Sequence, residues 1–358
     1  MAAPQDGLRI EGSGTQPALG FACCEQGLDE ARALFADDRV MGQLEALHAS
    51  VAVPTLDFSA ERAGIVRRLN QAGIAAVAWI LLPKEQGYYL NADNASQAAS
   101  RFAEFEDWTR QYDLHWTAVG LDVEPRFSEL ASLKGHWWRA LTTLVRHDLD
   151  RERAVRAREE YATLIQRVQS SGYPVQTYQM PFIVDERMEN SSLLDRLLGT
   201  VDVRGNIEYL MLYTSFAPSI GTGMIAVLGP HAQAIVVGVT DEGPGGLNWA
   251  EFSRDLIVAS HFTRNVGVYD VEGCVRQGFL PRLVTMDWSQ SIVVPAASIR
   301  RARWLGEGLR LALWLGDRLA WIGAGALLVL LLAIAVWRGR KRGLGASSQA
   351  GDSTGLTR

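Results

Sequence analysis

The sequence is poor in cysteine, and its first residues lack the basic and apolar stretches of a secretory signal peptide. Three cysteines, Cys23, Cys24 and Cys274, are too few to staple 358 residues, which excludes a disulfide scaffold and predicts small buried side chains. Hydrophobic residues make up 48% of the chain, too many for a disordered protein and too few for a polytopic membrane protein. We therefore expect one large domain or two of medium size.

The charge is distributed unevenly along the chain. Between Arg300 and Arg342, nine basic residues stand against two acidic ones, a net charge of +7. Since residues 343–358 are neutral overall and the whole chain carries −5, residues 1–299 carry −12. An acidic body with a single basic segment is not typical of nucleic-acid-binding proteins, so we expect no nucleic acid as a partner.

The basic segment encloses an apolar one, residues 319–337, which has 19 residues and no charged side chain. A helix needs about 20 such residues to cross a bilayer. Trp321 and Trp337 lie at its two ends, where interfacial aromatic residues are expected. The sequence therefore predicts one transmembrane helix, with the lipid bilayer as its partner.

Basic residues on either side of 319–337 predict the orientation of this helix. Four follow it at once and two lie within about 15 residues before it, which favours a cytoplasmic C-terminal tail and places the body outside the cytoplasm. The N-terminus, however, has no signal peptide. A start further upstream, or a tail-anchored protein whose body stays inside, would each explain this conflict.

The flanking segments complete the predicted organisation. Residues 291–318 contain arginines alternating with Trp304, Trp314 and leucines at helical spacing, which predicts an amphipathic juxtamembrane helix on the membrane surface. The alternative is a helix that simply continues into the span. Residues 338–358 are predicted to form a basic flexible tail, and residues 1–16 an N-terminal tail.

Residues 17–290 contain eight short apolar runs that alternate with amphipathic helical patterns. The runs cover 18–24, 51–58, 74–82, 117–123, 174–180, 207–213, 234–240 and 266–271, and the clearest helical patterns cover 60–72, 96–111, 151–170 and 248–260. Such alternation is typical of parallel strands buried on both faces. Eight such units in about 280 residues predict an α/β fold, a closed (β/α)8 or TIM barrel.

An open doubly wound sheet is the alternative fold. Such a sheet would normally have a glycine-rich phosphate turn after its first strand, and residues 21–25 have none. The longest connection, residues 125–172, is predicted to be a helical insertion after the fourth strand.

The carboxyl ends of the predicted strands are rich in acidic and aromatic residues, and in a barrel these ends form the functional site. Carboxylates hydrogen-bond to sugar hydroxyls and aromatic rings stack on sugar rings, so a glycan is the expected ligand. The residues expected to bind it are Glu25, Asp57, Glu85, Tyr89, Tyr178, Gln179, Asp241, Tyr269 and Glu272.

The sharpest motif is Gly120-Leu-Asp122-Val-Glu124-Pro, at the end of the fourth strand. Residues two apart on a strand point to the same side, so Asp122 and Glu124 project together with Cα atoms about 6.5 Å apart. Two close carboxylates do not both ionise freely, so the pKa of one is expected to rise. A protonated Glu beside an ionised Asp is what a glycosidic general acid requires.

Gly-Leu-Asp122-Val-Glu124 resembles the end of the fourth-strand motif D-G-x-D-x-D-x-E of family 18 glycoside hydrolases, which are chitinase-like barrels. Met211-Leu-Tyr213 is similar to a motif on the sixth strand of that family. The resemblance implies that Glu124 is the catalytic acid and that Asp122 orients an acetamido group of the substrate. It further implies that Tyr213 holds this group as it attacks the anomeric carbon. The D-x-E strand is also similar to that of family 25 lysozymes.

Three functions stay open. The first is a membrane-anchored glycoside hydrolase that acts on a cell-envelope or extracellular glycan by carboxylate acid/base catalysis. The second is a non-catalytic barrel that binds a carbohydrate or a protein. The third is a lyase or isomerase with a metal held among Asp57, Glu85, Glu124 and Asp241. We favour the first, for which no metal and no cofactor are expected; the sugar, the linkage and the oligomeric state stay open.

Overall fold

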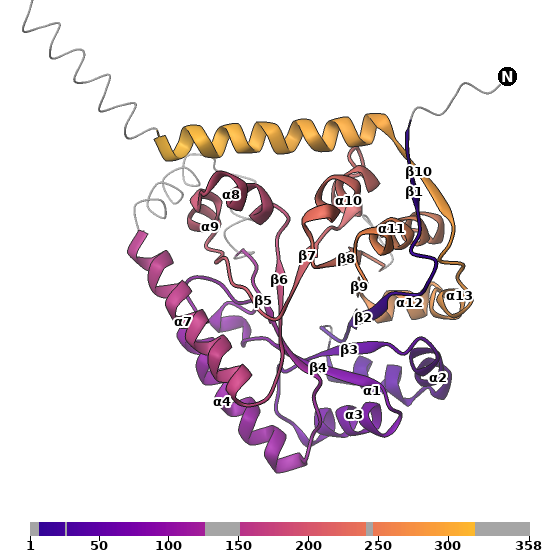
Figure 1. Ribbon diagram of the computed structural model, residues 1–358. Coiled ribbons are helices and arrows are strands. Elements are labelled where there is room, and N and C mark those ends of the chain that lie inside the picture. The colour runs from indigo at the N-terminus through magenta and orange to yellow at the C-terminus, as the bar shows by residue number, and fades with distance from the viewer. Residues whose placement is uncertain (1–6, 26, 126–150, 241–245, 319–358) are drawn as a thin grey trace, which may run out of the picture. The chain divides into compact units, whose positions relative to one another are not determined.

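The computed structural model describes residues 7–25, 27–125, 151–240 and 246–318. Eight parallel strands form a closed barrel in the order of the chain, and helices surround it (Figure 1). The last strand of the ring pairs with the first, with Val266 opposite Leu19. The predicted (β/α)8 barrel is confirmed, and closure of the ring excludes the open sheet.

Each of the eight predicted runs overlaps one barrel strand, and β3 and β9 begin one residue before their predicted runs. The strands are β2 (Ala18–Ala22), β3 (Ser50–Pro54), β4 (Ala75–Ile80), β5 (Ala118–Asp122), β6 (Val175–Gln179), β7 (Ile207–Met211), β8 (Ala234–Gly238) and β9 (Asn265–Tyr269). All five residues of β5 and of β8 are buried. Alternate residues face the barrel interior and the surrounding helices, so both faces are apolar and the strands read as continuous hydrophobic runs.

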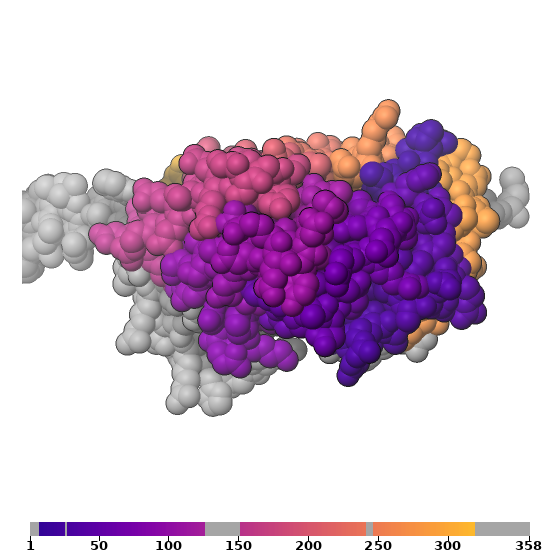
Figure 2. All heavy atoms as spheres, turned by 90° about the horizontal axis from the view of Figure 1, so that it is seen from below, coloured from indigo at the N-terminus to yellow at the C-terminus, as the bar shows by residue number. Residues whose placement is uncertain are grey.

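The helices lie where their hydrophobic spacing predicts them, and the four clearest patterns correspond to α3, α4, α7 and α11. The helices are α1 (Leu28–Ala36), α2 (Asp38–Ala46), α3 (Ala60–Gln71), α4 (Ala95–Tyr112), α7 (Arg151–Ser170), α8 (Ile183–Glu189), α9 (Leu193–Leu198), α10 (Thr222–Leu228), α11 (Trp249–Phe262), α12 (Val271–Arg276) and α13 (Leu280–Val284). Short 3-10 turns occur at η1 (Lys84–Gln86), η2 (Thr214–Phe216) and η3 (Gly229–His231). Seen from below, the face in Figure 2 is formed largely by the N-terminal half of the chain, coloured indigo to purple.

The predicted insertion at 125–172 needs a correction. Residues 126–150 lie outside the described residues, but α7 is the helix that the fourth βα unit of a barrel requires. It lies beside α4 (Figure 1), where Arg167 pairs with Glu106 at 2.6 Å and its guanidinium lies 5.5 Å from the centre of the Phe102 ring. The long connection made a regular barrel helix look like part of an insertion.

The predicted N-terminal tail is also corrected. Residues Gly7–Glu11 form β1, which pairs antiparallel with β10 (Ser291–Pro295). The run GLRIE has one buried side chain, Ile10, so it carries too little hydrophobic periodicity to be recognised from the sequence. The start of the predicted juxtamembrane segment is therefore a strand, and its helix begins at residue 296.

The C-terminal region divides between two compact units, residues 1–310 and 311–358. The helix that begins at residue 296 is described as far as 318 and agrees with the predicted helical spacing. The predicted span 319–337 and the tail 338–358 lie outside the described residues. None of the helices within the described ranges is long and apolar enough to cross a membrane.

The cysteines are buried, as expected, but two of them are not free thiols. Cys23 and Cys24 form a disulfide with each other, and Cys274 is free. A bond between neighbours does not link distant segments, so the structure agrees that disulfides do not staple the fold. Cys24 has a φ of +67°, and its backbone N–H donates a hydrogen bond to the buried carboxylate of Glu272.

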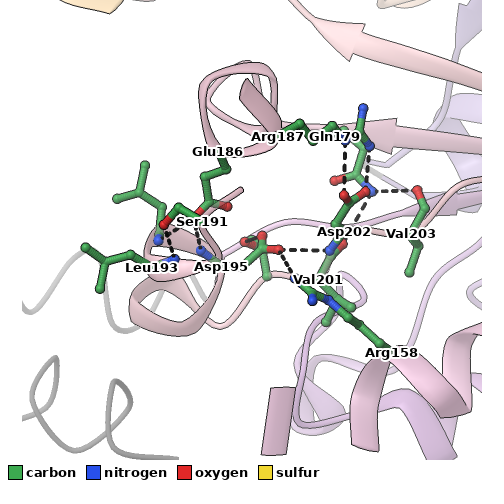
Figure 3. A network of polar contacts seen from close by, with 12 residues as sticks. Arg158, Gln179, Glu186, Arg187, Ser191, Leu193, Asp195, Val201, Asp202 and Val203 are labelled. Carbon is green, nitrogen blue, oxygen red and sulfur yellow. Dashed lines mark hydrogen bonds and ion pairs between the residues drawn. The ribbon is translucent and has the colours of Figure 1, made fainter. Parts of the chain in front are cut away.

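Buried charges form a network that ties α8 and α9 to the barrel (Figure 3). The Glu186 carboxylate accepts a hydrogen bond from the backbone N–H of Leu194 at 2.6 Å, and Arg187 pairs with Asp202 at 2.5 Å. The Asp195 carboxylate accepts from the backbone N–H of Asp202 at 3.0 Å. Burial, together with the charge of Asp195, raises the pKa of Glu186 to about 8.

This raised pKa makes the stability of the fold depend on pH. Since the ordinary pKa of Glu186 is 4.5 and the folded value about 8, its stabilising contribution is present below pH 4.5 and is lost as the pH rises to 8. Glu186→Gln keeps an oxygen to accept from Leu194 but does not titrate. We expect its Tm to fall less steeply than that of the unchanged protein across this range, measured by thermal unfolding. Equal slopes would contradict the role of Glu186.

Candidate active site

Six of the predicted site residues line one cavity inside the barrel, toward the carboxyl ends of its strands. They are Tyr89, Asp122, Glu124, Tyr178, Tyr213 and Tyr269. Asp122 ends β5 and Glu124 lies two residues later, and both border the cavity, as the two-residue period of a strand predicts. The cavity has a volume of about 140 Å³, enough for several water molecules.

The cavity exists because one side of the barrel interior carries very small residues. Barrel interiors are usually filled by layers of bulky side chains. On β2, β3 and β9 five of the lining residues are small, namely Gly20, Ala22, Ser50, Ala52 and Gly267, beside the larger Phe21, Val268 and Tyr269. On the opposite side the rings of Tyr178 and Tyr209 stack with their centroids 5.1 Å apart. The asymmetry leaves an open space with an aromatic wall.

Asp122 and Trp79 place two unpartnered polar groups at this cavity. Asp122 is 4% exposed, and its Oδ1 atom has no hydrogen-bond partner in the described part of the chain. The indole Nε1 of Trp79, on β4, is likewise buried and forms no hydrogen bond within normal geometry there. The Trp79 N–H acts on the Asp122 carboxylate, but neither atom has a hydrogen bond of normal geometry in the described part of the chain. Buried polar groups are nearly always hydrogen-bonded, so both groups are suited to a polar ligand.

Asp122 and Glu124 share a strongly acidic environment. Burial raises the pKa of Glu124 to about 8, and the charge of Glu25 contributes to this rise. Burial and the charges of Glu124 and Glu25 also hold the pKa of Asp122 well above its usual value, although the nearby Trp79 N–H lowers it. Because the two carboxyls are coupled, the pair retains a proton at neutral pH.

Glu25 is the third carboxylate of the site, and two tyrosines hold it. The Tyr89 hydroxyl donates to Oε1 at 2.7 Å, and the Tyr269 hydroxyl donates to Oε2. Burial raises the pKa of both phenols, and the charges around them raise it further, so both remain hydrogen-bond donors. Two donors on one carboxylate stabilise its negative charge beside the proton-sharing pair.

Tyr213 continues the aromatic wall toward the mouth of the cavity. Its ring lies 5.8 Å from that of Tyr269 and 5.7 Å, edge to face, from that of Phe216. Burial raises the pKa of Tyr213 well above its usual value, and the charge of Glu124 adds to the effect, so its hydroxyl is a donor. The wall therefore combines apolar ring faces with hydroxyl donors.

Two predicted binding residues, Asp57 and Glu85, do not line the cavity. The Asp57 carboxylate pairs with buried Arg62 at 2.5 Å and accepts from the Ser59 N–H at the start of α3. Burial alone would raise the pKa of Asp57, but the Arg62 and Ser59 hydrogen bonds hold it below its usual value. Glu85 is exposed in η1 and does not line the cavity.

Gln179 and Glu272 are buried but also face away from the cavity. The Gln179 amide donates to the backbone oxygens of Val203 at 3.1 Å and Val201 at 3.4 Å, so it fixes the segment after α9 (Figure 3). Glu272 accepts from the Cys24 N–H. Asp241 lies outside the described residues.

Several cavity residues were missed by reading the strand ends alone. Trp79, Gln176, Tyr209 and Met211 line the cavity below the ends of β4, β6 and β7. The Tyr178 hydroxyl donates to Gln176 at 3.0 Å. The two-residue period of a strand places Tyr209 and Met211 on the same side as Tyr213, so these two cavity residues could have been predicted from the sequence.

The chain departs from the family 18 motif at Thr117 and Gly120, where that motif has acidic residues. The Thr117 hydroxyl donates to the backbone oxygen of Ala76 at 3.0 Å. A Cβ atom at position 120 would lie 3.2 Å from the Tyr178 ring, so a larger residue there would have to displace that ring. The position of the Tyr178 ring therefore depends on the glycine at position 120.

The described residues bring together no group of three His, Cys, Asp or Glu side chains arranged to hold a metal ion. The metal ligands predicted for a lyase or isomerase, where they lie in the described ranges, likewise form no such group. Asp57 pairs with Arg62, and Glu85 is exposed on η1. The two therefore lie apart from Glu124 at the cavity.

By sequence the chain matches no known protein family and no curated protein. Several solved structures are distantly similar to the chain. The glycoside hydrolase domain of PgaB (BpsB) from Bordetella bronchiseptica is 10% identical, covers 75% of this chain and 98% of its own, and has a TM-score of 0.46. A GH18 chitinase from Pseudoalteromonas aurantia is 9% identical, covers 75% of this chain and 99% of its own, and has a TM-score of 0.43. A D-allulose 3-epimerase from Methylomonas sp. is 11% identical, covers 84% of this chain and 99% of its own, and has a TM-score of 0.40. These similarities are distant, and they assign the chain to no family.

The charge of Glu25 is predicted to act directly on Glu124. Glu25→Gln removes that charge, so the pKa of Glu124 should fall from about 8 toward its ordinary value of 4.5. The pKa is measured by ¹³C NMR titration of glutamate carboxyl carbons, with Glu124→Gln identifying the resonance. The exposed Glu85→Gln is the matched control and should leave the titration unchanged. A Glu124 titration equal in the Glu25 variant and the control would refute the coupling.

Proposed function

We propose that this barrel is a glycoside hydrolase in which Glu124 is the general acid. The observation that carries the proposal is a carboxyl with a raised pKa, at the end of a barrel strand, in a cavity walled by tyrosines. A glycosidic general acid must hold its proton at the working pH, and burial beside a second carboxyl supplies this condition. The tyrosine wall supports a sugar ring as the ligand.

In the proposed reaction Glu124 gives its proton to the glycosidic oxygen while the bond from that oxygen to the anomeric carbon breaks. Water adds to the anomeric carbon and loses a proton. Glu25 is the proposed acceptor of that proton, because Tyr89 and Tyr269 leave further lone pairs on each of its oxygens. Glu124 regains its proton from solvent.

Asp122 and Trp79 are proposed to recognise the substrate. A group that pairs with both must accept a hydrogen bond from the Trp79 N–H and donate one to Asp122 Oδ1. An amide has both capacities, and the family 18 resemblance implies an acetamido group. Tyr213 is proposed to hold the same group through its hydroxyl.

The proposed place of action is the cell envelope. The support is in the sequence, where residues 319–337 are long and apolar enough to span a bilayer and basic residues follow at once. We propose a single-pass anchor with a cytoplasmic C-terminal tail and the barrel outside the cytoplasm, acting on an envelope or extracellular glycan.

Glu124→Gln is expected to lower hydrolysis by about 10²–10⁴-fold, the usual contribution of one general acid. The measurement is release of reducing ends from chito-oligosaccharides, peptidoglycan fragments and neutral glucans. Aryl glycosides with good leaving groups need no protonation and should lose much less activity with the variant. Glu85→Gln is the matched control and should retain full activity.

A folded Glu124→Gln protein with unchanged activity on every glycan would overturn the assignment of the acid. Saccharide binding without turnover by the unchanged protein would favour the alternative of a non-catalytic binding barrel. The departures at Thr117 and Gly120 are the observation behind that alternative.

The activity of the unchanged protein is expected to fall as the pH rises through about 8, because Glu124 then loses the proton that it must donate.

Tyr89→Phe and Tyr269→Phe should each lower kcat, because they remove a donor that stabilises the Glu25 carboxylate. The measurement is kcat/KM and kcat as functions of pH. A rate that still rises above pH 8 would argue against a protonated Glu124 as the acid.

A further inference from the structure

Residues 296–310 form a helix that packs on the barrel by one side. Gly223 N–H donates to the Ser298 hydroxyl at 3.0 Å, Arg301 donates to the backbone oxygen of Ser219 at 3.0 Å, and Arg310 lies 3.6 Å from Asp185. Ile299 and Ala302 are buried on this side. These contacts with α8, α10 and the loop before α10 fix which side of the helix faces solvent.

The solvent-facing side is also apolar. Trp304 is 78% exposed, more than any other large hydrophobic residue in the described ranges, and Leu305 beside it is 56% exposed. A helix on the surface of a globular domain normally turns charged and polar residues outward. Two large apolar side chains held in water indicate a surface that is covered by a partner.

The exposed apolar residues are surrounded by arginine. Arg300, Arg301 and Arg303 are exposed within one turn of Trp304, and Glu307 is the acidic residue near them. Arginine pairs with phosphate groups through its planar fork of donors, and tryptophan prefers the boundary between headgroups and acyl chains. The two residue types together fit an anionic lipid surface better than an acidic protein, which would leave the tryptophan uncovered.

Residues 311–318, in the second unit, have the same composition. Leu311 is 59% exposed, and Trp314 and Leu315 are also exposed. The chain then continues directly into the uncharged residues 319–337.

We propose that the exposed side of the helix at residues 296–310, defined by Trp304 and Leu305 with the arginines around them, lies in the headgroup region of an anionic bilayer. The helix thereby holds the barrel against the membrane in one orientation. This role is independent of glycan hydrolysis, and it goes beyond the proposed anchor, which would tether the barrel without orienting it.

The test uses the full chain in phosphatidylcholine vesicles with and without phosphatidylglycerol. Trp304→Cys is spin-labelled, and collisions with oxygen, which concentrates in lipid, are compared with collisions with a water-soluble nickel complex. The native cysteines are buried, so they do not compete for the label. The matched control is Glu61→Cys on α3, an exposed site on the far side of the barrel from residues 296–310 (Figure 1).

In anionic vesicles we expect the label at 304 to favour oxygen and the label at 61 to favour the nickel complex. The preference at 304 should weaken without phosphatidylglycerol and in Arg300→Glu/Arg303→Glu. A bound chain whose label at 304 behaves like the control overturns the inference and leaves the anchor standing. Failure of the full chain to bind either vesicle overturns both, and short distances between labels at 304 would assign the surface to a second copy of the chain instead.

Discussion

The candidate site depends on three carboxyl groups placed together in a largely closed space. Asp122, Glu124 and Glu25 would repel one another if all were ionised, and burial makes the charges of Asp122 and Glu124 more costly than in water. Two tyrosine hydroxyls donate to Glu25, and the pair of Asp122 and Glu124 at the end of β5 keeps a proton. A retained proton beside a carboxylate held by two hydroxyl donors is the arrangement that the proposed acid–base reaction uses.

The barrel supplies this arrangement from segments far apart in the sequence. Glu25 follows the first barrel strand, Glu124 the fourth, Tyr213 the sixth and Tyr269 the eighth, and closure of the ring brings them to one rim. Gly20, Ser50 and Gly267 keep the interior open beneath them. The stability of the fold comes from the apolar layer between strands and helices, so these interior positions are free to serve a ligand.

Charge separates the two surfaces of the molecule by task. Residues 1–299 carry −12, and part of this charge is the acidic cavity, whereas the +7 segment begins at the helix after β10. In the proposed reaction the acidic groups of the cavity act on a proton, and the arginines around Trp304 suit phosphate. A barrel oriented by that helix would present its cavity in a fixed direction relative to the lipid surface.

The sequence by itself determined the eight barrel strands, the main helices and the joint projection of Asp122 and Glu124, because these follow from local periodicity. It did not reveal β1, whose one buried residue leaves no periodic pattern. Nor did it separate Glu25, which the cavity residues Tyr89 and Tyr269 hold, from Asp57, which pairs with Arg62, since both are acids at strand ends. Only the tertiary structure decided this, because whether a carboxylate faces a cavity or a neighbouring guanidinium depends on how the ring of strands closes and which side chains fill it.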